Sequence, residues 1–245
     1  MCIRDRSVVY TAVASGDSSD CDGVPVNYTI TVNPLAMVNP VDDEILCDGD
    51  NLFIEFTSLV TGGEISYLWT NDNTDIGLAD EGSGNLDFIV TNNSEESITA
   101  NITVTPTFTN GDNSNDGDPI DFSITVNPSA QVDNIDDINV SNGTLIGLIE
   151  FTSINTGGTT TYEWTNDNTD IGLVDSGNES IPEFTAINDG DVPITGTIEV
   201  TPSLEENGVI CSGDPINFTI TVNPDAQVNE IDDLVYNDGD LVQIP

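Results

Sequence analysis

A ten-residue segment, WTNDNTDIGL, occurs twice without change in this sequence, at 69–78 and at 164–173. Other landmarks return at nearly the same distance. The TVNP segment reaches its proline at Pro34, Pro128 and Pro224, with spacings of 94 and 96 residues. Solenoid repeats are much shorter, at about 20–50 residues, whereas an immunoglobulin-like β-sandwich has about 100 residues. The repeat therefore predicts a row of separate small domains.

These landmarks divide the 245 residues into five parts. Residues 8–34 match the C-terminal part of a repeat, 35–128 and 129–224 are whole repeats, and 225–245 is the start of a further repeat. Residues 1–7 (MCIRDRS) hold both basic residues and are too short and polar for a signal peptide, whose apolar core has about 7–15 residues. We interpret them as foreign to the protein, and we expect the sequence to be a segment of a longer chain.

Within each repeat, apolar residues alternate with polar ones. In PIDFSITVNP, Ile120, Phe122, Ile124 and Val126 alternate with Asp, Ser and Thr, and the segment at 215–224 repeats this pattern. Side chains of a strand point alternately to the two faces of a sheet, so each segment has one face for a core and one for water. Segments of this kind predict about seven short strands per repeat.

No helix is expected, because apolar residues never keep a spacing of three and four residues over three turns. The sequence predicts an all-β fold made of tandem antiparallel β-sandwiches of the immunoglobulin-like class. Such sandwiches often bury a tryptophan of the third strand, and YLW and YEW end the third predicted strand. TNDNTD then predicts an Asn/Asp-rich turn, after which IGL returns to the core. The aromatic residues predicted in the core are Trp69, Trp164, Phe56, Phe151, Phe122 and Phe218.

The charge balance argues against several functions. The chain has 44 acidic residues, two basic residues and no histidine, which gives a formal net charge of −42. Such a surface repels nucleic acid, and no stretch approaches the roughly 20 apolar residues of a membrane-spanning helix. Without His or Lys the chain lacks the usual residues of acid–base and Schiff-base catalysis. Paired carboxylates remain, as in glycosidases, but the acidic residues recur in each repeat, so we expect no enzyme.

Two groups of acidic residues are candidate calcium sites, because Ca²⁺ prefers several carboxylate, amide and carbonyl oxygens. DNSNDGD places Asp112, Ser114, Asp116 and Asp118 at alternate positions, as in the first half of an EF-hand loop, although Ser123 stands at position 12 instead of Glu. The second group is an Asp-Asp pair after each VNP segment, near a predicted domain junction that calcium would stiffen. The alternative for both groups is exposed acidic residues without an ion. The pairs are Asp42 with Asp43, Asp136 with Asp137, and Asp232 with Asp233.

Three cysteines lie beyond the N-terminal heptapeptide. Cys21 and Cys211 occupy the same position of the repeat, where the middle repeat has Asn115, and Cys47 corresponds to Ser141. Both pairings within one repeat therefore lack one thiol. Cys21 and Cys47 are both present across a junction, but strands of roughly eight residues at ~3.3 Å each separate them from the linker. Disulfide Cα atoms lie within ~7 Å, so the spacing predicts no assured disulfide.

The order FTS, WTNDN, IGL, ITVTP, GDPI and FxITVNP resembles the PKD-like domains found in tandem in large secreted or surface proteins of Bacteroidota. The resemblance covers the chain from about Val8 to its end. It implies an immunoglobulin-like β-sandwich and a role as a spacer or adhesive module, often in proteins exported by the type IX route. The WDFGDG turn of the founding PKD domains is absent, and WTNDN in its place indicates the PKD-like group.

These observations favour a non-catalytic spacer or stalk segment of an adhesin-like extracellular or cell-surface repeat protein, whose contacts are neighbouring repeats of the same chain. The alternative is an adhesive module whose Asn/Asp/Thr-rich turns bind polysaccharide or another cell's surface, with calcium as a cofactor. Carbohydrate sites usually use exposed aromatic residues. Here aromatic residues are only 6% of the chain and many fit core positions, which favours the spacer.

Overall fold

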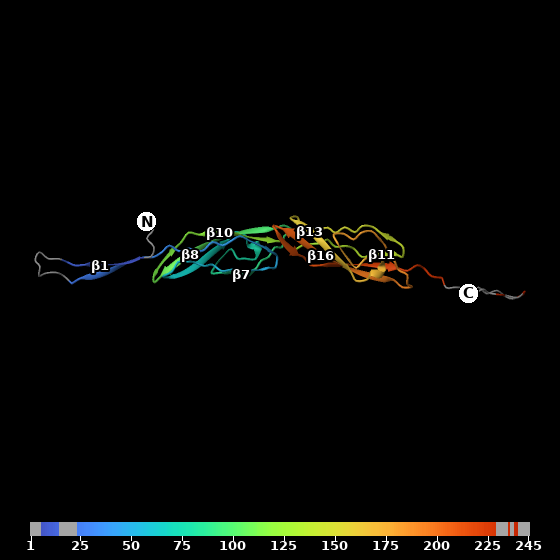
Figure 1. The fold of residues 1–245 in the computed structure, drawn as a ribbon, viewed down its shortest axis with the longest axis horizontal. Helices are drawn as coiled ribbons and strands as arrows, with labels where there is room; N and C mark the ends of the chain where they lie inside the picture. Colours follow the sequence, from blue (N-terminus) through green and yellow to red (C-terminus); the bar gives the residue numbers. More distant parts are fainter. Residues whose placement is uncertain (1–5, 15–23, 229–234, 236–237, 240–245) are drawn as a thin grey trace. The chain divides into compact units, whose positions relative to one another are not determined.

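The structure, a computed structural model, describes residues 6–14, 24–228, 235 and 238–239 (Figure 1). The chain forms two compact units. The first comprises Met1–Gln131, Ser153–Thr160 and Ser203–Asp214, and the second comprises Val132–Thr152, Thr161–Pro202 and Pro215–Pro245. Each unit contains one sandwich core, and the two are described in turn.

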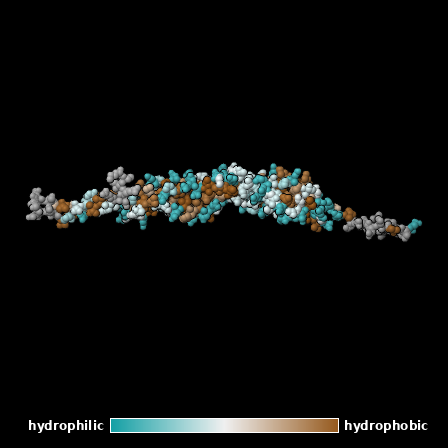
Figure 2. Space-filling model, viewed as in Figure 1, coloured by the Kyte–Doolittle hydropathy of each residue, from teal (hydrophilic) through white to brown (hydrophobic). Residues whose placement is uncertain are grey.

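The first unit begins with an antiparallel hairpin of β1 (Arg6–Ala12) and β2 (Val26–Val32). Tyr10 lies opposite Tyr28, and their rings stack at 5.2 Å. These two side chains are about half exposed, as is Ile30 on the same face, and Figure 2 shows hydrophobic residues along the hairpin. The hairpin therefore has the alternating pattern of a core face, although the described residues leave that face open.

The sandwich of the first unit has eight strands. The larger sheet has the order β3-β10-β8-β5-β6, with β9 on the far part of β8, and β4 pairs with β7 in the second sheet. Neighbouring strands are antiparallel except β3 and β10, which run parallel with Glu44 beside Ile124. The strands are β3 (Glu44–Cys47), β4 (Asn51–Ile54), β5 (Glu64–Asn71), β6 (Glu81–Ser83), β7 (Leu86–Ile89), β8 (Ile98–Asn110), β9 (Asn113–Asp116) and β10 (Ile120–Asn127).

The core of this sandwich follows from the alternation in its strands. Ala100, Ile102 and Val104 on β8 and Ile124 on β10 are completely buried, while the residues between them face outward. Side chains from β4, β5 and β7 close the other side of the same cluster. Burying a large apolar side chain contributes about 1.5–3 kcal/mol, so this cluster offsets much of the entropy lost on folding.

The second sandwich repeats this arrangement with a shorter second sheet; its β17 and the end of β16 fall within the first unit. Its larger sheet has the order β11-β18-β16-β13-β14, with β17 on β16, and β11 runs parallel to β18. The second sheet consists of β12 and β15, and Ile149 forms an isolated bridge with Ile181. The strands are β11 (Ile138–Ser141), β12 (Leu145–Ile146), β13 (Thr159–Asn166), β14 (Ser176–Asn178), β15 (Phe184–Thr185), β16 (Ile194–Glu206), β17 (Val209–Ser212) and β18 (Ile216–Asn223).

A tryptophan occupies the same place in each core. Trp69 on β5 pairs with Gly82 on β6, and Trp164 on β13 pairs with Gly177 on β14. A Cβ atom on either glycine would lie within 2.5 Å of the tryptophan ring, so the close approach of ring and backbone requires glycine. The six aromatic side chains placed in the core by the sequence are all buried: Trp69, Trp164, Phe56, Phe151, Phe122 and Phe218.

The prediction of an all-β, immunoglobulin-like sandwich fold is confirmed, with two differences. Each sandwich has eight strands rather than about seven, because the hairpin β8–β9, like β16–β17, adds a short strand. The first and last strands of each sandwich are parallel rather than antiparallel. Alternation of apolar residues shows which face of a strand is buried, but it does not show the direction of the neighbouring strand.

Candidate functional site

The repeated decamer forms a corner in each sandwich, which we call the corner (69–78 and 164–173). In the first corner, the buried side chain of Asn71 donates through Nδ2 to the carbonyl oxygens of Leu78 (3.0 Å) and Ala79 (3.2 Å). Its Oδ1 accepts the backbone N–H of Asn73 at 3.0 Å. Asn166 makes the same three bonds in the second corner. Both the N–H and the oxygen of the amide thus stabilise the turn in which the chain reverses direction.

Asp72 connects the corner to the neighbouring strand β8. Its carboxylate accepts the side-chain amide N–H of Asn101 at 2.8 Å and the backbone N–H of the same residue at 2.7 Å. These two bonds lower the pKa of Asp72 below its ordinary value, the side-chain bond contributing most. In the second corner, Asp167 accepts the backbone N–H of Thr197 at 2.6 Å.

A single 3₁₀ turn completes each corner: η1 (Thr74–Ile76) and η2 (Thr169–Ile171). Asn73 caps η1 by accepting the backbone N–H of Asp75 at 3.1 Å, as asparagine commonly does at helix starts. Gly77 follows with φ of +88°, and a Cβ atom there would lie 2.9 Å from the carbonyl oxygen of Ile89. The asparagine side chains hold the backbone of the corner, and the Asp72 and Asp167 carboxylates hold the neighbouring strand, so the identical decamer has a structural explanation.

In each of the two described Asp-Asp pairs, the second aspartate binds the backbone of the last strand. Asp43 accepts the backbone N–H of Ser123, and Asp137 accepts that of Thr219, both at 2.7 Å. These bonds, the backbone bond foremost, lower the pKa of both carboxyls. Asp42 and Asp136 are exposed beside them. The third pair, Asp232 and Asp233, lies outside the described residues.

The DNSNDGD segment lies on the hairpin of β8 and β9. Asp112 is in the turn, Ser114 and Asp116 are on the extended strand β9, and Asp118 follows it. The carboxylate of Asp116 accepts the hydroxyl of Thr107 at 2.6 Å. In the described part of the chain, no three Asp, Glu, His or Cys side chains group closely enough to hold a metal ion. Calcium binding at either group stays a prediction from the sequence.

Cys47 and Cys211 form a disulfide, with their Cα atoms 5.5 Å apart. The expectation of no assured disulfide was therefore wrong. The sequence shows pairings only within one repeat or from Cys21 to Cys47, and Cys21 lies outside the described residues. The end of the hairpin β16–β17, at Ser203–Asp214, belongs to the first unit. There Cys211 of one repeat meets the end of β3 in the preceding repeat.

The hairpin ends also form hydrogen bonds with the asparagine of the VNP segments. Asn127 is completely buried, donates to the carbonyl oxygen of Glu206 at 2.8 Å, and accepts the side-chain N–H of Asn207 at 2.9 Å. One repeat earlier, Asn110 donates to Oδ1 of Asn33 at 3.1 Å. The equivalent asparagine of successive repeats thus contacts the hairpin of the following repeat. The sequence signal for this contact is the VNP segment, which recurs in every repeat.

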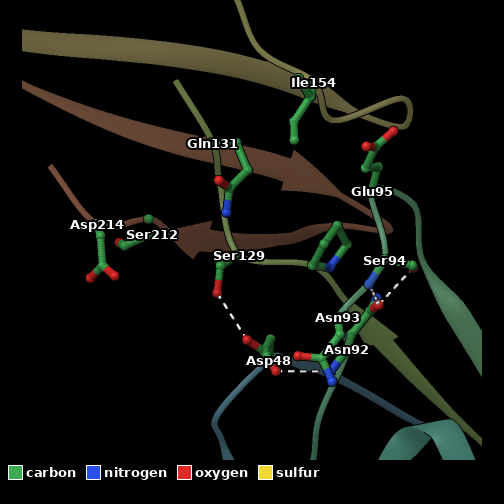
Figure 3. A pocket seen from close by; sticks show the side chains of 12 residues that line it. Asp48, Asn92, Asn93, Ser94, Glu95, Ser129, Gln131, Ile154, Ser212 and Asp214 are labelled. Carbon is green, nitrogen blue, oxygen red and sulfur yellow. Dashed lines mark hydrogen bonds between the residues drawn. The ribbon is translucent and has the colours of Figure 1, made fainter. Parts of the chain in front are cut away.

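A cavity of about 620 Å³ lies next to the disulfide-linked strands, within the first unit. Figure 3 shows Asp48 at its base, where the carboxylate accepts the backbone N–H of Asn92 at 2.8 Å and the hydroxyl of Ser129 at 3.2 Å. Glu95 and Asp214 add two further carboxylates to a mainly polar lining, and none of the lining residues is aromatic. The cavity could hold a small polar molecule, but it offers no flat apolar surface for a sugar ring.

No protein-family model matches the sequence, and no curated protein is similar to it. Among solved structures, the chain is similar to the fibronectin(III)-like modules of Clostridium thermocellum CbhA, with 12% identity, 80% of this chain and 100% of that chain covered, and a TM-score of 0.31. It is also similar to human protocadherin-24 EC1-2, with 9% identity, 75% of this chain and 94% of that chain covered, and a TM-score of 0.38. A third similar structure is that of the FN1-FN3 domains of chicken CNTN1, with 9% identity, 88% of this chain and 77% of that chain covered, and a TM-score of 0.28.

TM-scores of this size are too low to assign a family or a function. Among the described residues, no helix has the length and apolarity needed to cross a membrane. The assignment of the chain rests on its own sheets: two successive sandwiches, each with the strand order just described, in which the first strand lies beside the last. The chain is an array of immunoglobulin-like β-sandwich domains.

Proposed function

We propose that this chain is a tension-bearing spacer segment of a large extracellular or cell-surface repeat protein, built from PKD-like domains and without catalytic activity. The observation that carries the proposal is the parallel pairing of the first and last strands in each sandwich. Glu44 to Cys47 lie beside Ile124 to Asn127 in the first, and β11 lies beside β18 in the same way in the second.

This pairing determines how a sandwich responds to a pull on its two ends. Tension draws the first strand backward from its N-terminal end and the last strand forward from its C-terminal end. In a parallel pair these two forces act along the strands in opposite directions, and the ladder bonds are evenly spaced between them. The bonds are loaded together, so they must break together. An antiparallel pair pulled at its open end would lose its bonds one at a time.

Two carboxylates reinforce the same pair of strands. Asp43 immediately precedes β3 and binds the backbone of Ser123 on β10. Asp137 immediately precedes β11 and binds the backbone of Thr219 on β18. A charged acceptor makes a stronger hydrogen bond than a neutral one. Each bond therefore adds to the resistance at the point where the chain enters the sandwich.

The disulfide between Cys47 and Cys211 supports the proposed location. Disulfides persist in oxidising compartments such as the cell exterior and are rare in the reducing cytosol. The net charge of −42 adds a second argument, because strong self-repulsion keeps such chains from associating with one another.

An adhesive module that binds polysaccharide or another cell's surface, with calcium as its cofactor, is the second candidate. The polar cavity at Asp48 is the observation that favours it. Against it stands the absence of aromatic side chains from the cavity lining, because sugar rings commonly pack on exposed aromatic faces.

The test combines a mechanical and a binding measurement. The variant Cys47→Ser/Cys211→Ser, which loads both sandwiches, is stretched as a single molecule from its two ends. We expect two abrupt unfolding steps, each releasing about 320 Å for a repeat of ~95 residues at ~3.4 Å per residue. The wild-type chain is expected to show no retention on glycan arrays and no cell adhesion. Smooth elongation without steps, or glycan retention, would contradict the spacer proposal.

A further inference from the structure

The disulfide closes an unusually long covalent loop. Cys47 is the last residue of β3, the first strand of its repeat, and Cys211 precedes β18, the last strand of the following repeat. The two residues are 164 positions apart in the sequence. All strands from β4 to β17 therefore lie within the loop or end in it, and only β3 and β18 of the two sandwiches lie outside it.

We infer that the Cys47–Cys211 disulfide is a covalent bypass for tension, which makes two successive repeats a single mechanical element. The inference deepens the proposed spacer function and depends on it for the presence of a load. A pull that arrives along β3 passes from Cys47 directly to Cys211 and leaves through β18. The intervening residues then carry no tension through their own backbone, whatever the strength of their hydrogen bonds.

The loop contains most of the hydrophobic core of each sandwich. Both tryptophans, Trp69 and Trp164, and both corners lie between the two cysteines. So do most of the buried side chains of the two cores. While the disulfide is closed, it carries the tension in place of the hydrogen bonds of the parallel pairs β3–β10 and β11–β18. These hydrogen bonds bear the tension only after the disulfide has been opened.

The surroundings of the disulfide protect it from exchange. Cys211 is 1% exposed and Cys47 is partly buried. The hairpin that carries Cys211 is held by the buried Asn127, which donates to the carbonyl oxygen of Glu206 and accepts the side-chain N–H of Asn207. Thiol–disulfide exchange requires a thiolate to reach one of the two sulfur atoms. The bond is therefore expected to remain closed while the hairpin is in place.

The preceding hairpin of the chain shows the same position without a thiol. Asn115 stands there instead of cysteine, and its side chain donates a hydrogen bond to the carbonyl oxygen of Pro34 at 3.2 Å. Likewise, Ser141 stands where the first repeat has Cys47. One contact between successive repeats is thus covalent and the preceding one is not, so the bypass joins the repeats 35–128 and 129–224 as a pair.

The experiment stretches the full chain as a single molecule from its two ends, either oxidised or after a phosphine has reduced it in guanidinium chloride and the chain has been refolded. The reductant supplies the two electrons that convert the disulfide to two thiols and becomes a phosphine oxide, with water supplying the oxygen and protons. We expect the oxidised chain to reach full extension about 550 Å short of the reduced chain, from 164 residues at ~3.4 Å each. The matched control Cys47→Ser/Cys211→Ser is expected to reach the longer extension under both conditions.

Equal extension of the oxidised wild type and the double variant would overturn the inference. So would peptide mass spectrometry that found Cys47 or Cys211 as a free thiol or paired with another cysteine. The inference and the spacer proposal fail in different ways. Stepless elongation of the double variant, or glycan binding, would remove the spacer function while leaving the 550 Å difference intact. Loss of that difference would remove the bypass while leaving the unfolding steps of the sandwiches intact.

Discussion

The carboxylate of Asp43 holds the backbone N–H of Ser123 at 2.7 Å, so that the residue before the first strand of a sandwich is tied to its last strand. The relationship recurs between Asp137 and Thr219 at the same distance. In both cases the bond to the backbone lowers the pKa of the carboxyl below its ordinary value of 3.8. A contact shared by both sandwiches is the natural place to begin mutational tests.

The first prediction concerns the pH dependence of this contact. A carboxyl whose folded-state pKa is lowered stabilises the fold above its unfolded pKa, and the contribution is lost as the pH falls through the folded value. Asp43→Ala is therefore expected to lower Tm at pH 7, and the difference from wild type should shrink below about pH 3.8. Asp42→Ala is the control. Asp42 is the exposed residue next to Asp43, and its replacement should lower Tm less. A difference that stayed constant down to pH 2 would contradict the assignment.

The second prediction tests the contact between tryptophan and glycine. In Gly177→Ala the new Cβ atom would lie 2.5 Å from the ring of Trp164, which is 2% exposed and has no room to move aside. Overpacking of this kind costs about 1–3 kcal/mol, measurable by urea unfolding. Gly147→Ala serves as the control in the same unit, since nothing lies within 4 Å of its Cβ position. Equal stability of the two variants would refute the packing argument.

The third prediction tests the buried amide of the corner. Asn166→Asp keeps the shape of the side chain but replaces the N–H donor to Leu173 and Val174 with a carboxylate oxygen. Leaving buried carbonyls unpaired beside a charge should cost at least about 2–3 kcal/mol at pH 7. The loss should diminish in acid, when the carboxyl is protonated.

The same substitution two residues later provides the control for the corner. Asn168 caps η2 through its Oδ1, which accepts the backbone N–H of Asp170 at 3.1 Å. Aspartate is as good a cap as asparagine. Asn168→Asp also removes the N–H donor to the carbonyl oxygen of Thr195, but that bond is exposed to water, so the variant should change the free energy of unfolding much less. If both variants were equally stable, the buried amide would not be the determinant of the corner.

The fourth prediction concerns access to the disulfide. Because Cys211 is almost completely buried, a reductant in native buffer should leave Cys47 and Cys211 unreactive toward an alkylating agent. After unfolding in guanidinium chloride, both thiols should be alkylated within minutes, as detected by peptide mass spectrometry. Rapid alkylation of the native protein would show that the hairpin does not cover the bond.

The fifth prediction is the calcium binding suggested by the sequence. Millimolar calcium is expected to raise Tm more than sodium chloride of equal ionic strength does, because ions held by carboxylates stabilise the folded state. The variant Asp42→Asn/Asp136→Asn should remove this difference if the Asp-Asp pairs hold the ion, and Asp112→Asn/Asp118→Asn should do so if the hairpin does. Equal Tm values in the two salts would show that neither the Asp-Asp pairs nor the DNSNDGD segment binds calcium.

The fold was predictable from the sequence because its main determinants are periodic. The spacing of Pro34, Pro128 and Pro224 defines the repeat, and the alternation around Phe122 and Phe218 defines which side chains are buried. Both patterns depend on local geometry that any strand shares. The aromatic residues of the core follow from the same alternation, since a large side chain on the inner face has nowhere else to go.

The contacts that involve distant parts of the chain were not predictable in this way. The parallel pairing of β3 with β10 and the partner of Cys47 depend on where strand ends meet in space. A local pattern contains no information about such meetings. The roles of Asp43 and Asn71 were missed for a related reason. The sequence presents Asp43 as a candidate calcium ligand and Asn71 as a turn residue, and only the structure shows that each binds the backbone of a specific partner.

The hydrogen bonds of the VNP asparagines carry a consequence for how such a gene can grow. Each contact is directional, because Asn33 meets the hairpin of the next repeat at Asn110, and Asn127 does the same at Asn207. A duplicated repeat inserted after residue 128 would preserve this polar contact and would bring its own copy of Cys47 or Cys211, so that one disulfide could still form and one thiol would be left without a partner. The hydrogen bonds thus tolerate an added repeat at that boundary, whereas the cysteines do so only by leaving a free thiol.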